Sequence, residues 1–179
     1  MLGRAHTIFS GGWRRGAVVT VLAGCLVLGG CKRTDETAVR ERLEQWFALG
    51  ETMSFQAQRG CAAGAIKLVD ERIASKLPVA TNVPQALITL RKRGAVAIDD
   101  TRQSPDQALL QIVNAARPIG MRMRIAGLEG RACMDSAVKD AFGRALVNPR
   151  AVLVLDRDFG ALILMDADER QLIVSMGAE

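Results

Sequence analysis

The spacing of apolar positions changes along the chain and predicts two kinds of secondary structure. In several segments between residues 35 and 147, apolar residues recur every three or four positions, as on one face of an α-helix. From residue 151 the chain instead contains three short apolar runs, which are separated by charged turns at residues 156–160 and 166–170. This second pattern is typical of an antiparallel meander of three strands.

Cap residues set the limits of the predicted helices. Ser104, Pro105 and Gln107 form a capping box with proline in the first turn, and this helix start is the best defined in the sequence. Similar start and stop signals, combined with helical spacing, predict helices over residues 35–49, 84–93, 105–113, 118–134 and 136–147.

The fourth of these helices carries an apolar stripe with glycines behind it. Met121, Ile125 and Leu128 fall on one face at 100° per residue, whereas Gly127 and Gly130 lie on the opposite side. We therefore expect this helix to pack against other elements on two sides.

A β-hairpin is predicted before the helical middle of the chain. Apolar residues alternate along residues 53–57, Arg59 and Gly60 form a turn, and a second strand starts at Cys61 with small residues that permit close approach. A short strand is predicted at residues 95–98. The fold class is therefore α+β: an antiparallel sheet, made of this N-terminal hairpin and the C-terminal three-stranded meander, packs with four to five helices in a single domain, residues 36–179.

The first 30 residues have the pattern of an export signal. Arg4, Arg14 and Arg15 precede an apolar run from Ala17 to Gly30, and no acidic residue occurs among them. The run is about fourteen residues long, which is shorter than the roughly 20 residues that a membrane-spanning helix needs. This segment is thus predicted to be a signal peptide and not a permanent span.

The end of this segment, Leu28, Gly29, Gly30 and Cys31, resembles the lipobox of bacterial lipoproteins. The resemblance implies cleavage before Cys31, three acyl chains on that residue, a lipid-bound tether over residues 31–35 and a place in a bacterial envelope. In this family an aspartate directly after the cysteine retains the protein in the inner membrane. Lys32 occupies that position here, so the resemblance implies the periplasmic face of the outer membrane.

Other interpretations of the N-terminus remain. The letters of Leu22 to Cys25 also fit a lipobox, although cleavage there would leave an apolar LVLGG stretch at the start of the mature chain and would shorten the apolar run. An ordinary secretory signal with incidental cysteines, or an uncleaved anchor, would give a similar pattern.

Loss of the signal changes the charge and the inventory of reactive groups. Removing 30 of 179 residues leaves 149, and removing three of the 24 basic residues leaves 21 against 19 acidic residues. Such a nearly neutral chain gives no reason to expect nucleic acid as a partner. His6 is the only histidine and leaves with the signal, so histidine triads, histidine-ligated zinc and histidine proton shuttles are excluded.

Two cysteines remain besides Cys31. Cys61 and Cys133 are 72 residues apart, and an even pair in an oxidising compartment favours a disulfide bond. Free or redox-active thiols are the alternative, although no C-x-x-C spacing is present to lower a thiol pKa.

The candidate sites are few. Four arginines in one segment accompany a single acid, Glu129, and suit phosphates or carboxylates of envelope polymers; the alternative is arginines that snorkel beside a buried helix. These candidate anion-binding residues are Arg117, Arg122, Arg124 and Arg131. The acidic turns after residue 155 do not match a calcium loop, so neither a metal nor a cofactor is expected. Two acidic pairs are candidates for carboxylate catalysis, Asp99 with Asp100 and Glu129 with Asp135.

These observations predict a lipoprotein bound to the bilayer through acylated Cys31. Its domain is expected to act as a non-catalytic interaction or structural module whose partner is another envelope protein or a cell-wall polymer. The alternatives are an envelope enzyme that acts on the cell wall through carboxylates and a carrier of a small apolar ligand.

Overall fold

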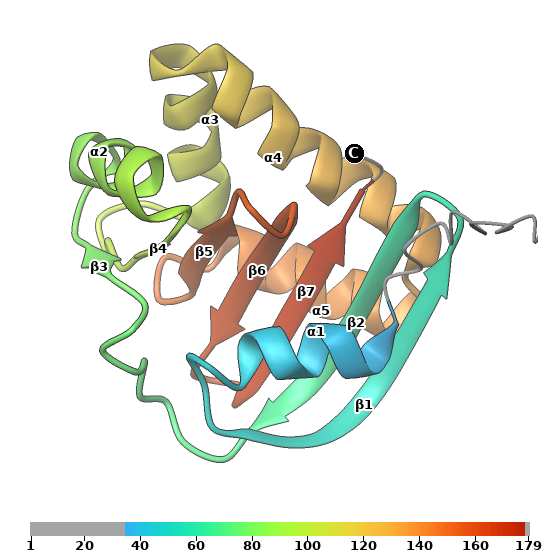
Figure 1. Ribbon diagram of the computed structural model, residues 1–179. Helices are drawn as coiled ribbons and strands as arrows, with labels where there is room; N and C mark the ends of the chain where they lie inside the picture. The colour runs from blue at the N-terminus through green and yellow to red at the C-terminus, as the bar shows by residue number, and fades with distance from the viewer. Residues whose placement is uncertain (1–34, 178–179) are drawn as a thin grey trace, which may run out of the picture. The chain divides into compact units, whose positions relative to one another are not determined.

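A seven-stranded sheet lies at the centre of the computed structural model, which describes residues 35–177 (Figure 1). Its strands are β1 (Leu49–Gln58), β2 (Cys61–Leu68), β3 (Val79–Ala80), β4 (Ala95–Ile98), β5 (Val152–Asp156), β6 (Ala161–Asp166) and β7 (Gln171–Met176). The helices are α1 (Glu36–Leu43), α2 (Val83–Arg93), α3 (Pro105–Ala115), α4 (Arg117–Glu129) and α5 (Ser136–Val147), with a 3-10 helix, η1 (Gly130–Cys133), between the last two. The α+β fold class is confirmed.

The hairpin and the meander form one sheet, as the sequence predicts. The strand order is β1-β2-β7-β6-β5-β4-β3, and β2 pairs with β7 from Ala62 opposite Met176 to Lys67 opposite Gln171. Every pairing is antiparallel except that of β3 with β4. The sequence pattern does not predict β3, because this strand has only two residues and so shows no periodicity.

Both faces of the central strands are buried, which explains why their sequences are continuously apolar. Leu153 and Leu162 point into a core beneath α2 to α5. Their neighbours Val154 and Ile163 point into a second core on the opposite face, where residues of α1 cover the sheet. The side chains alternate between the two cores with the two-residue period of a strand.

The first helix is shorter than predicted. It ends at Leu43, not near residue 49, and Trp46 and Phe47 lie in the following turn with 4% exposure each. Both rings pack into the core on the α1 face, and Leu49 already pairs with Leu68 in the sheet. Helical spacing alone cannot distinguish this turn from a further helical turn, because strand pairing and ring burial decide where the chain leaves the helix.

The predicted apolar face of α4 is exposed instead of buried. The exposed fractions of Met121, Ile125 and Leu128 are 37%, 39% and 54%, whereas the small residues behind them face the sheet. A Cβ atom at Gly120 would lie 2.5 Å from the Cα atom of Val113, so α3 and α4 approach each other backbone to backbone there. This close approach orients the helix. As predicted, α4 packs against other elements on two sides, α3 and the sheet, but its apolar stripe is not one of the packed faces. The 3-10 turn η1 follows Glu129, so the regular helix also ends earlier than expected.

A disulfide bond connects Cys61 at the start of β2 to Cys133 in η1, with their Cα atoms 5.9 Å apart. A second link lies beside it: the Ser54 hydroxyl donates a hydrogen bond of 2.5 Å to Asp135, which caps α5 by accepting from the Val138 N–H. These hydrogen bonds hold the pKa of Asp135 below its ordinary value, and the bond from Ser54 is the largest cause. The hairpin is therefore attached to the helical layer at two adjacent points.

An ion pair attaches α1 to the turn between β5 and β6. The Arg42 guanidinium donates to the buried Asp156 carboxylate at 2.7 and 3.2 Å and lies 4.6 Å from the centroid of the Trp46 ring. Asp156 also accepts the backbone N–H groups of Asp158 and Phe159. The hydrogen bonds with Asp156 raise the pKa of Arg42 above its ordinary value.

The 72-residue separation of the bridged cysteines predicts how much stability the disulfide provides. In the chain-entropy relation a loop of this length contributes about 4.4 kcal/mol. We expect the double variant Cys61→Ala and Cys133→Ala to lose up to that amount of unfolding free energy in urea denaturation. Reductant should lower the urea midpoint of the wild type and leave that of the variant unchanged. A wild-type midpoint that is the same with and without reductant would contradict the disulfide bond.

Substitution of Arg42 should destabilise the domain more than substitution of its neighbour Arg40. Arg42→Gln leaves the Asp156 carboxylate buried without its cation, and we expect a loss of about 2 kcal/mol in unfolding free energy. Arg40 is as exposed as Arg42 and donates to Thr52, but its acidic partner Glu44 is exposed. Arg40→Gln therefore leaves no buried charge behind and should cost less than about 1 kcal/mol. Equal losses in chemical denaturation would show that burial of the pair has no energetic consequence.

Candidate binding groove between α3, α4 and α5

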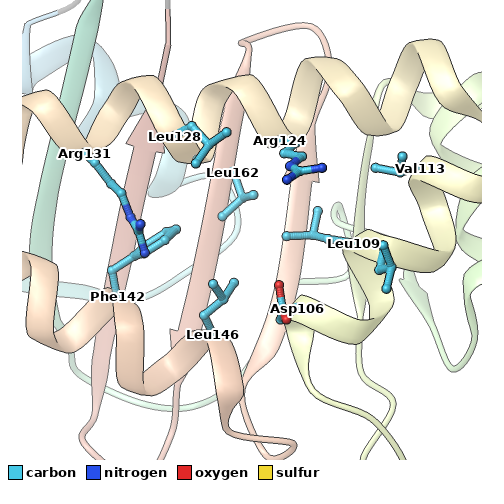
Figure 2. Close-up of a pocket in the computed structure, with 11 residues that line it drawn as sticks. Asp106, Leu109, Val113, Arg124, Leu128, Arg131, Phe142, Leu146 and Leu162 are labelled. Atoms are coloured by element: carbon cyan, nitrogen blue, oxygen red, sulfur yellow. The ribbon is translucent and has the colours of Figure 1, made fainter.

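A groove of about 320 Å³ lies in the helical layer, with β6 beneath it (Figure 2). Three helices, η1 and one strand contribute to its walls and floor. Its lining residues are Asp106, Leu109, Leu110 and Val113 from α3, Arg124, Gly127 and Leu128 from α4, Arg131 from η1, Phe142 and Leu146 from α5, and Leu162 from β6. Most of these side chains are apolar, as in most small-molecule sites.

The missing side chain of Gly127 keeps the floor of the groove open. A Cβ atom there would lie 3.6 Å from Leu162 Cδ1 and 3.8 Å from Phe142 Cζ, which is ordinary van der Waals contact. Gly127 thus has space for a methyl group, whereas Gly120 on the same helix has none. Gly127 therefore lies at the base of the groove, next to Leu162 and Phe142, and leaves room there for a small group.

Two of the four predicted arginines line the groove. Arg124 and Arg131 extend along the α4 side, and the Arg131 guanidinium lies 5.9 Å from the centroid of the Phe142 ring. Neither guanidinium group forms a hydrogen bond or an ion pair with another residue in the part of the chain that the structure describes. Asp106 supplies the opposite charge across the groove, on α3 (Figure 2).

The other two arginines do not reach the groove. Arg117 is the first residue of α4, and Arg122 follows in the second turn of that helix. Both side chains are exposed, and neither lines the groove. The structure therefore separates the four arginines into a groove pair and an outer pair. The predicted lipidation site, Cys31, lies outside the described residues.

Sequence reasoning missed the apolar floor of the groove. The sequence predicts a helix over residues 136–147, which contains Phe142 and Leu146, and places Gly127 at the back of the preceding helix, but it does not bring these residues together. The positions of Gly127 and Arg124 on one helix carry a partial signal, but their juxtaposition with Leu162 depends on packing between elements more than thirty residues apart.

Exposed leucines border the groove. Leu110 on α3 is 58% exposed and Leu128 on α4 is 54% exposed, and both belong to the lining. Ile125 and Met121 continue the exposed apolar surface along α4. Contiguous exposed apolar surface on a folded protein commonly marks an interaction site.

The carboxylate pairs proposed from the sequence have structural partners. Asp135 caps α5, and Asp100 accepts hydrogen bonds from Arg102 that lower the pKa of Asp100. Asp100 and Arg102 also line a more open hollow between α2 and α3, where they pair with each other. Within residues 35–177 no group of three or more potential His, Cys, Asp or Glu ligands is arranged to hold a metal ion.

Comparison with known proteins gives neither a family for this chain nor a function for the groove. No protein family, no curated protein and no solved structure matches this chain. Among the helices of residues 35–177, none has the length and apolar character required to cross a bilayer.

Three helical glycines provide a test of the packing that forms the groove. We expect Gly127→Ala and Gly143→Ala to stabilise the domain by about 0.5–1 kcal/mol each, since alanine reduces the entropy of the unfolded chain and both sites have room. Gly120→Ala should destabilise it, because the new Cβ atom would collide with the backbone of Val113. Thermal and urea unfolding of the three variants would measure these changes; destabilisation by Gly127→Ala would contradict an open floor.

Proposed function

We propose that this chain is a lipid-anchored lipoprotein of a bacterial envelope whose α+β domain is a non-catalytic interaction module, with the groove between α3, α4 and α5 as its binding surface. The resemblance of Leu28 to Cys31 to a lipobox supports the anchor. The observation that carries the binding role is the apolar groove, bordered by exposed Leu110 and Leu128 and by two arginines without acidic partners among residues 35–177.

A short tether would hold the module close to the bilayer. Four residue steps separate Cys31 from Asp35, the cap of α1, and span at most about 14 Å when fully extended. A domain of this size has a radius of gyration of about 15 Å. Confinement within this distance raises the effective concentration of the module toward partners at the same surface, namely another envelope protein or a cell-wall polymer.

The composition of the groove favours binding over hydrolysis. It contains one carboxylate, Asp106, whereas glycoside hydrolysis generally requires two carboxyl groups on either side of the scissile bond. The apolar lining and the volume near 320 Å³ also favour a second candidate function, carriage of a small ligand with an apolar part. Both candidate functions use the groove as the binding surface, and neither requires the domain to catalyse a reaction.

The anchor is tested by replacing the candidate cysteines separately. Mass spectrometry of the protein from its native host should show a chain that starts at Cys31 with acyl chains attached. Cys31→Ser should abolish acylation and move the protein out of the membrane fraction, whereas Cys25→Ser should change neither property. An unacylated wild-type chain, or acylation lost only in Cys25→Ser, would overturn the proposed anchor.

The binding surface is tested by placing a photoreactive benzoylphenylalanine at Leu110 or Leu128 and irradiating intact envelopes. We expect reproducible crosslinked products from both positions. The control is the same residue at Ile88, which is 55% exposed on α2 and does not line the groove. Crosslinks from Ile88 alone would refute the assignment of the binding surface to the groove.

A further inference from the structure

We infer that the groove binds a single-chain anionic amphiphile, with its acidic group between Arg124 and Arg131 and its hydrocarbon chain over Leu162, Leu146 and Leu109. The inference rests on the proposed function, because it names the ligand class of the same groove. The acidic group is a carboxylate or a phosphate, and the chain is one acyl or alkyl chain.

The charge of the groove selects an anion on one side. Six other arginines in residues 35–177 pair with an acidic residue, as Arg42 does with Asp156 and Arg102 with Asp100. Further arginines of these residues have no such pair, but of the arginines only Arg124 and Arg131 line this groove. Arg124 and Arg131 lie seven residues apart on one side of the groove and have no such acid in residues 35–177. The planar guanidinium group binds carboxylate and phosphate oxygens in pairs, so an anion bound there gains two charge-assisted contacts.

The opposite side fixes the direction of the ligand. Asp106 on α3 faces the groove across from the arginines (Figure 2) and would repel a second acidic group. The negative end is therefore directed toward α4, and the uncharged remainder lies over the floor. A dianionic ligand with charges at both ends fits this arrangement poorly.

The floor requires an apolar occupant. Leu109, Leu146, Leu162 and Phe142 provide no hydrogen-bonding groups, so a sugar polymer pressed against them would lose hydration without compensation. The volume of about 320 Å³ is at the lower end of the usual range of 300–1,000 Å³ for small-molecule sites. One chain is thus favoured over the two chains of a phospholipid.

The environment implied by the anchor supplies such molecules. A module that is confined to a lipid surface meets the free fatty acids and single-chain lipids of that surface at high local concentration. An acidic protein segment with an apolar side chain would satisfy part of the same chemistry, and the experiment below treats it as the alternative outcome.

The experiment uses the acylated full-length product in phosphatidylcholine vesicles and a twelve-carbon carboxylate with a photoreactive diazirine near its methyl end. After irradiation, peptide mass spectrometry should find label on α3, α5 or β6 residues of the groove. The methyl ester of the same probe, which lacks the charge, should label these peptides at least five-fold less.

Matched variants separate the groove from the rest of α4. The double variant Arg124→Gln and Arg131→Gln should reduce labelling at least five-fold, whereas Arg117→Gln and Arg122→Gln, with the same charge change on the same helix, should leave it unchanged. Circular dichroism and thermal unfolding would verify that both pairs fold.

A second pair of variants blocks the space itself. Gly127→Leu places a side chain on the floor and should abolish labelling, whereas Gly143→Leu extends into open space on α5 and should not. Because the Gly143 variant makes the same chemical change in a helix, it controls for a general effect on stability.

The outcomes distinguish this inference from the proposed function. Equal labelling by the carboxylate and its ester, equal loss in both arginine pairs, or no label in the groove of an acylated and folded protein would each overturn the amphiphile. In the last case a specific protein crosslink from Leu128 would assign the groove to a protein partner and leave the proposed function standing. Absence of acyl chains on Cys31 would instead refute the anchor.

Discussion

The antiparallel pairing of β2 with β7 is the constraint on which the rest of the domain depends. It brings together segments about 110 residues apart in sequence and joins the N-terminal hairpin to the C-terminal meander. Closing such a large loop costs conformational entropy. The cost is offset by two apolar cores, one on each face of the resulting sheet, and by the covalent link from β2 to η1, between α4 and α5.

The two helical layers differ in how closely they cover the sheet. On one face, α1 and the rings after it are fixed by a buried ion pair and leave little exposed apolar surface. On the other face, α4 approaches its neighbours through Gly120 and Gly130 and buries Met123, and this contact turns Met121, Ile125 and Leu128 outward. The groove and the exposed leucines beside it both follow from this packing of α4. Gly120 and Gly130 bring the helix close to its neighbours, and Gly127 leaves space at the base of the groove.

The sequence predicts the features of this fold that are encoded locally. The capping box at Ser104 and the turn at Gly60 each depend on residues within a few positions of one another, and both occur where expected. The three apolar runs of the meander also match β5 to β7, because strands buried on both faces have an unmistakable composition.

Features that depend on contacts between distant segments are not predictable in this way. The end of α1 is set by the pairing of Leu49 with Leu68, and the orientation of α4 by its contact with Val113. The candidate groove depends on both kinds of feature, those encoded locally and those set by contacts between distant segments. Its arginines are visible in the sequence, but only the orientation of α4 separates Arg124 and Arg131 from the outer pair, and the apolar floor comes from elements that the sequence does not connect.

The contact between Arg42 and Asp156 would have a mechanical consequence if the chain is anchored at Cys31 as proposed. Tension on the tether would then enter the domain through α1. The Arg42 guanidinium connects this helix to the turn that joins β5 and β6, close to the middle strand of the sheet, and Arg40 connects it to Thr52 of the edge strand β1. Peeling α1 away would expose a buried carboxylate and two aromatic rings together, so the join between tether and domain should behave as a rigid coupling and not as a hinge.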